Sequence, residues 1–160
     1  MPVIVESLQG PVPCPSCRAT AQWHGVQGLL DDDSLRWDTE TACPACGSGT
    51  TVCGRDLPTG MRERMLTEHG RTVLRLGASA RRPAVMRVLR ERLGVGLTEI
   101  RALVEQVVAG EYGGTLPETE LLARKLRAAG VDAVAVRETP FRVRRVRADE
   151  LPRQGRSSPP

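Results

Sequence analysis

The sequence has very few aromatic residues: its 160 residues include two tryptophans, one tyrosine and one phenylalanine. Proteins that stack the bases of single-stranded nucleic acid need several aromatic faces, so the composition nearly excludes that class. No apolar run approaches the roughly 20 residues needed to cross a membrane. The residues after Met1 contain no basic segment followed by an apolar stretch, so we expect no secretory signal. We therefore expect a cytoplasmic protein with an aliphatic core and no membrane partner.

No arrangement typical of an active site is recognisable either. The sequence offers no serine–histidine–aspartate candidates, no glycine-rich phosphate loop before a helix, and no paired carboxylates beside either of its two histidines. We therefore expect a protein that is not an enzyme and has no small-molecule substrate.

Four of the five cysteines form two Cys-x-x-Cys pairs, and 25 residues separate the pairs. Cys14 and Cys17 make the first pair, and Cys43 and Cys46 make the second. A tetrahedral zinc ion is held by four thiolates at about 2.3 Å, which two such turns can supply. The proline in each pair favours a tight bend. The spacing thus predicts a structural Zn²⁺ site with no open position for catalysis.

Two other interpretations of the cysteines remain open. Two disulfides would fit the count, but the expected reducing compartment disfavours them. A thioredoxin-like redox motif would need a single pair beside a βαβ unit. The fifth cysteine, Cys53, has no partner in either pattern, and we expect it to be a small buried side chain.

Residues 1–57 resemble a zinc ribbon, with strand-like stretches over 19–26 and 35–42 between the two cysteine pairs. The acidic residues 31–34 between these stretches predict a solvated turn. Residues 58–70 read as a linker with a short helix over 61–69, because Pro58 interrupts the chain and Gly70 ends the helical pattern.

Periodic segments over 71–140 predict a second domain with alternating strands and helices. Pro83 and Pro117 favour helix starts, and the Gly94-Val95-Gly96 segment favours a turn. The expected elements are a strand over 72–76, helices over 83–93 and 97–108, a loop over 110–114, a helix from 117 to 130 and a strand over 131–137. The fold class is therefore α+β: a β-rich zinc ribbon followed by a small β-α-α-(β)-α-β sandwich.

The charge distribution supports this division. The net charge is +4 overall, but residues 1–70 carry 5 basic and 9 acidic side chains, whereas residues 71–140 carry 12 and 8. Residues 141–160, with 6 basic and 2 acidic side chains, read as a basic strand and a disordered tail. That tail could contact nucleic acid or simply be solvated.

Residues 72–137 resemble the C-terminal domain of the bacterial ribosomal stalk protein. The closest stretch runs from Gly94 to Glu105 and agrees in seven places with the family's Gly-Leu-Gly-Leu-Lys-Glu-Ala-Lys-x-Leu-Val-Glu signature. Pro83 to Arg87 stands where the family has Val-Ala-Val-Ile-Lys. The same fold occurs in an adaptor of a bacterial AAA+ protease.

The resemblance implies a protein-binding face on the first two helices of this domain, since that family docks on translational GTPases there. The corresponding positions are Arg82, Pro83, Met86, Arg87, Arg90 and Arg101. Residues 71–101 contain 8 basic and 2 acidic side chains, which favours a binding face, although a plain solvated helix surface would also fit.

The sequence therefore predicts a non-catalytic interaction protein whose arginine-rich face binds a protein, by resemblance a translational GTPase or the ribosome. Two alternatives stay open. The basic second half could bind RNA or DNA, or the chain could be a toxin-neutralising or adaptor protein that uses the same face.

Overall fold

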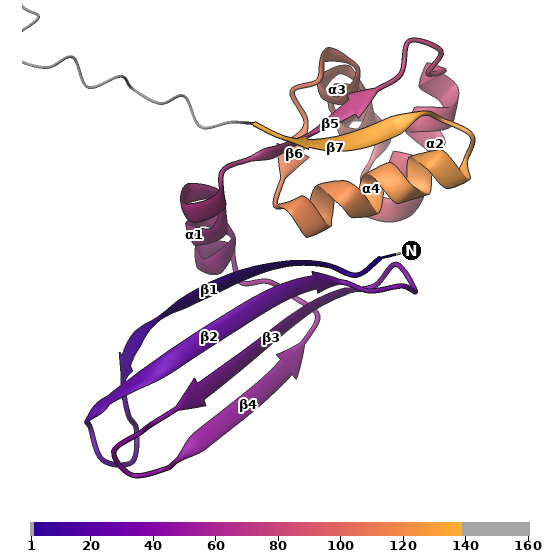
Figure 1. Ribbon diagram of the computed structural model, residues 1–160. Coiled ribbons are helices and arrows are strands. Elements are labelled where there is room, and N and C mark those ends of the chain that lie inside the picture. The colour runs from indigo at the N-terminus through magenta and orange to yellow at the C-terminus, as the bar shows by residue number, and fades with distance from the viewer. Residues whose placement is uncertain (1, 139–160) are drawn as a thin grey trace, which may run out of the picture.

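The computed structural model describes residues 2–138, and within them the protein is α+β, as predicted (Figure 1). It contains two antiparallel sheets, one of four strands and one of three. Helices α1 and α4 lie between the two sheets in Figure 1. No helix in the described part of the chain is long and apolar enough to cross a membrane. The predicted basic strand and tail over 141–160 lie outside the described residues.

The four-stranded sheet is a simple meander in which each strand pairs with the next along the chain. Its strands are β1 (Ile4–Pro13), β2 (Thr20–Leu29), β3 (Leu35–Ala42) and β4 (Gly49–Gly54). Two of these match the predicted stretches, although β2 extends to Leu29. Strands β1 and β4 were not predicted: β1 ends in prolines, which are tolerated because it is an edge strand, and β4 is short and lacks apolar alternation.

Helix α1 (Thr59–His69) covers one face of this sheet. Met65 is fully buried on it and packs against Leu8 of β1 and Trp37 of β3. The Trp37 ring lies 6.1 Å from the Trp23 ring, centroid to centroid. Gly25 lies beneath both rings, where any side chain would collide with them. Half of the protein's aromatic residues thus build one small core.

The second domain follows the predicted order of elements. It consists of β5 (Thr72–Leu76), α2 (Arg82–Leu93), α3 (Leu97–Ala109), β6 (Gly113–Gly114), α4 (Leu116–Ala128) and β7 (Ala133–Arg137). Strand β5 is central, with β6 and β7 on either side. The helices pack against the sheet around an aliphatic core that includes Leu74, Leu89, Ile100 and Leu126. Gly94, in the left-handed conformation, ends α2, and Gly96 caps α3.

The two sheets are joined through α4 by a buried polar interface. The Thr115 hydroxyl, at the N-cap of α4, donates to the Gln27 side-chain oxygen at 2.6 Å, and the next backbone amide donates to Glu6 at 3.0 Å. Arg124 is almost wholly buried and donates to the Leu30 carbonyl at 3.1 Å. Because buried charges are stable only when paired, these bonds hold the sheet in one position against α4.

The space beneath the two tryptophan rings generates a stability prediction. In Gly25→Ala the new Cβ would lie 2.4 Å from the Trp37 ring and 2.8 Å from the Trp23 ring, so the rings must move. We expect the free energy of unfolding to fall by about 1–3 kcal/mol, the usual cost of overpacking. Urea unfolding followed by tryptophan fluorescence measures this change.

Gly28→Ala on the same strand is the matched control. Its Cβ would meet the nearest atom at 3.8 Å, an ordinary van der Waals contact. We expect this variant to unfold close to the wild-type midpoint, and equal losses in the two variants would contradict the steric explanation.

Candidate functional site

The two cysteine pairs lie in equivalent loops at the same end of the four-stranded sheet, one between β1 and β2 and the other between β3 and β4. In each loop the first cysteine donates its amide to the residue five positions later, at 2.8 Å, and accepts from the residue four positions later, at 2.9 Å. That fourth residue has a positive φ, 63° for Arg18 and 72° for Gly47. The two loops therefore share one backbone conformation, and in the first an arginine occupies a position that favours glycine.

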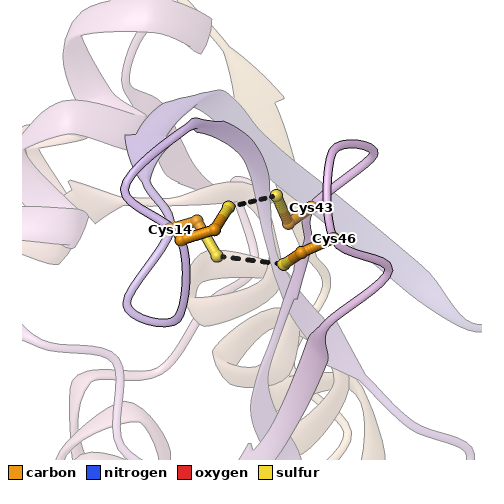
Figure 2. Close-up of side chains that lie close together, drawn as sticks. Cys14, Cys43 and Cys46 are labelled. Carbon is orange, nitrogen blue, oxygen red and sulfur yellow. Dashed lines mark hydrogen bonds between the residues drawn. The ribbon is translucent and has the colours of Figure 1, made fainter.

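The loops bring all four predicted sulfurs together, as Figure 2 shows. The Sγ atoms of Cys14, Cys17, Cys43 and Cys46 lie within 4.8 Å of one another. Cys14 Sγ lies 3.7 Å from Cys46 Sγ, and Cys17 Sγ lies 3.6 Å from Cys43 Sγ. A tetrahedron with bonds of about 2.3 Å has edges of about 3.8 Å, so the four sulfurs fit a single metal ion.

These separations do not fit two disulfides, whose sulfurs would lie about 2 Å apart, and all five cysteines are free. The first cysteine of each pair is buried and the second is exposed. The arrangement is thus compatible with a metal site that has two buried and two exposed sulfur donors.

Ser48 is a contributor to the site that the cysteine spacing did not reveal. Its hydroxyl lies 3.3 Å from Cys14 Sγ and 3.1 Å from Cys46 Sγ. This hydrogen bonding lowers the pKa of Cys14 to about 5 and also lowers the pKa of Cys46. A serine two positions after the second pair is the only sequence signal, and it is too common to be specific.

The four thiols cannot all ionise by themselves. The Ala19 backbone lowers the pKa of Cys17, but hydrogen bonding with Cys46 and Cys43 outweighs that effect and raises the pKa to about 12. Thiolates this close repel one another, so a cation is needed to hold all four in the ionised form.

Cys53 is exposed on β4 and does not belong to the cluster. The expectation that it would be buried is therefore wrong. Strand β4 is the outermost strand of its sheet and is exposed on both faces, so a side chain there has no core to enter.

Four of the six predicted partner-binding positions line one groove on α2. Met86, Arg87 and Arg90 form it together with Pro83 and other residues of the α2 C-terminal end: Glu91, Gly94 and Val95. The groove has a volume of about 610 Å³. Within the described part of the chain, the guanidinium groups of Arg87 and Arg90 make no hydrogen bond or ion pair. The groove therefore combines a partly apolar lining with two available positive charges.

The other two predicted residues are placed differently. Arg82 forms a two-bond ion pair with Glu105 of α3, so its charge is already compensated. Arg101 is exposed on α3 and is not among the groove residues. The sequence could not separate these roles, because all four arginines lie on exposed helix positions.

Comparisons with known proteins give no relative: no family model, no curated protein and no solved structure matches the chain.

The contacts of Ser48 generate a prediction about metal affinity. Ser48→Ala removes the hydroxyl that contacts two ligand sulfurs, and loss of such outer hydrogen bonds typically costs about 10- to 100-fold in metal affinity. We expect a loss near the lower end, about tenfold, because the four ligands stay in place. Competition with a chromophoric chelator measures the affinity.

Ser16→Ala is the control, since Ser16 lies inside the first pair and is exposed. Its affinity should equal that of the wild type. An unchanged affinity in Ser48→Ala would mean that the hydroxyl does not act on the bound metal.

Proposed function

We propose that this chain is a non-catalytic interaction protein whose α2 groove binds an acidic segment of a protein partner. The observation that carries the proposal is the pairing of Arg87 and Arg90, which have no intramolecular ion pair among residues 2–138, with the apolar lining that Met86 and Val95 supply. Acidic groups of the partner would face the guanidinium groups, and an apolar side chain would fill the space beside Met86.

The mixed lining favours a protein over a nucleic acid. Phosphate backbones are recognised mainly by charge, and they offer no apolar group for the methionine and valine. Glu91, which also lines the groove, would repel a continuous run of phosphates. A peptide that alternates acidic and apolar residues can fill the apolar lining and need not place a continuous run of negative charge beside Glu91.

The resemblance to the ribosomal stalk domain suggests the partner class. A translational GTPase or the ribosome is the partner that we propose, and the groove lies on α2, one of the two helices to which the resemblance assigns the binding face. A toxin-neutralising or adaptor role would use the same surface and differ only in the partner.

We propose that the metal at the four cysteines is Zn²⁺ and that it stabilises the ribbon. An all-sulfur tetrahedral donor set is typical of structural zinc, because every coordination position is filled and none remains for water. The ion would connect the β1–β2 and β3–β4 hairpins at the end of the sheet far from α4.

Elemental analysis tests the metal assignment. Purified protein should contain about one zinc ion per chain, as four-sulfur sites do, and Cys46→Ser should lose most of it. Cys53→Ser should retain the full amount, because Cys53 is outside the cluster. Iron in place of zinc, or no metal with oxidised cysteine pairs, would refute the assignment.

Charge reversal tests the groove. The double variant Arg87→Glu/Arg90→Glu should weaken binding of a purified translational GTPase by about tenfold or more, since each interfacial charge contact is worth on the order of 1 kcal/mol and reversal adds repulsion. Isothermal titration measures the affinity, and circular dichroism and metal content verify the fold.

The charge-matched control is Arg18→Glu/Arg75→Glu, which reverses two exposed arginines away from the groove. It should bind like the wild type. Equal losses in both variants would indicate nonspecific attraction, and a larger effect on RNA binding than on protein binding would favour the nucleic-acid alternative.

A further inference from the structure

Strand β4 leaves one edge of the four-stranded sheet open. It pairs with β3 on one side, and it is the last strand in the sheet order. Figure 1 shows it at the outer margin of the sheet, away from α1 and α4. Every residue from Gly49 to Cys53 is exposed. The backbone groups on its outer side are therefore accessible for pairing with another strand.

The composition of β4 suits such pairing. The strand reads Gly-Thr-Thr-Val-Cys-Gly, with three β-branched residues and neither proline nor charge. Natural proteins usually protect an open edge with proline, with charge or with a covering element. The opposite edge shows such protection, because β1 contains Pro11 and Pro13 and is covered by α1. Strand β4 has no equivalent protection among residues 2–138.

A second copy of the same strand is the occupant that fits best. A two-fold axis perpendicular to the sheet would run two β4 strands antiparallel and keep the same faces together. Val52 of each copy, 63% exposed in the single chain, would then lie near the axis and be partly covered. Because the strand is uncharged, it meets its copy without repulsion.

The charges that flank the strand are complementary in this arrangement. Antiparallel pairing brings the C-terminal end of one β4 beside the N-terminal end of the other, where the second cysteine loop lies. Arg55, directly after the strand, is exposed and would approach the thiolate cluster of the second copy. Four thiolates around one divalent cation carry net negative charge. This part of the argument rests on the metal assigned under the proposed function.

We propose that the chain forms a two-fold dimer through antiparallel β4–β4 pairing, which joins two four-stranded sheets into one of eight strands. The interface is small, so the dimer is a weak and reversible one. The dimer presents two α2 grooves, and a partner with two acidic segments would gain avidity from it.

Sedimentation equilibrium of the metal-loaded full-length chain tests the proposal. Between about 10 µM and about 1 mM, the range in which weak associations are populated, the wild type should pass from monomer to dimer. Val52→Lys places two like charges close together at the axis and should raise the dissociation constant at least about tenfold.

The matched control is Val5→Lys, which changes a valine that is 57% exposed on β1, the protected edge strand. It should dimerise like the wild type. Hydrogen exchange gives a second measurement: amides of residues 49–54 should become more protected as the wild-type concentration rises, and should not in Val52→Lys. Circular dichroism and zinc content confirm that each variant is folded and loaded.

A wild type that stays monomeric throughout this range would overturn the proposal and leave the β4 edge to an extended peptide of a partner. A dimer that Val52→Lys leaves intact, or that Val5→Lys disrupts equally, would place the interface elsewhere and also overturn it. Both outcomes are independent of the groove, because neither valine lines it.

Discussion

The N-terminal sheet depends on the four cysteine sulfurs because it has little else to hold its far end together. Its apolar core consists of Leu8, Trp37 and Met65 beneath α1, and toward the loops the buried residues reduce to Cys14, Ala21 and Cys43. A segment of this size rarely stabilises itself by apolar burial alone. A metal ion bound by both loops would supply the missing free energy at that end.

The other end of the same sheet is stabilised by buried hydrogen bonds. There, Glu6 and Gln27 are buried on the sheet and pair with the start of α4 or with β7. Arg124 is buried on α4 and donates to the Leu30 carbonyl at the end of the sheet. Breaking one such pair leaves a buried polar or charged group without a partner, which is costly. The sheet is therefore fixed at one end by directional hydrogen bonds, and the proposed metal would fix the other end through the four sulfurs. Strand β4 pairs with β3 on one side and is exposed on both faces, so it is the least stabilised strand of this sheet.

The groups that stabilise the fold are different from the groups that we propose to bind partners. The sulfur cluster fills its own coordination positions, and the polar junction satisfies its own charges. The groups that remain available for a partner lie elsewhere, on the α2 groove and along the β4 edge. Both proposed interactions use groups that have no partner within residues 2–138. The first uses guanidinium groups beside an apolar lining, and the second uses backbone groups of an uncharged strand.

Local patterns in the sequence were enough to identify the four cysteines that cluster and most of the second domain. Cysteine pairs with fixed spacing fold as local turns, and proline and glycine mark helix ends through their own backbone preferences, so positions such as Pro83 and Gly94 could be assigned directly. Tertiary structure alone decided the rest. Strand β1 ends in prolines and β4 lacks apolar alternation, so both are recognisable only from their pairing with the neighbouring strands β2 and β3. The burial of Glu6 and Arg124 depends on a junction between segments more than a hundred residues apart. Ser48 reaches Cys14 only after two hairpins meet, and Arg82 differs from Arg87 because α3 brings Glu105 beside it. A side chain's neighbours are set by packing across the whole fold, and no local pattern contains that information.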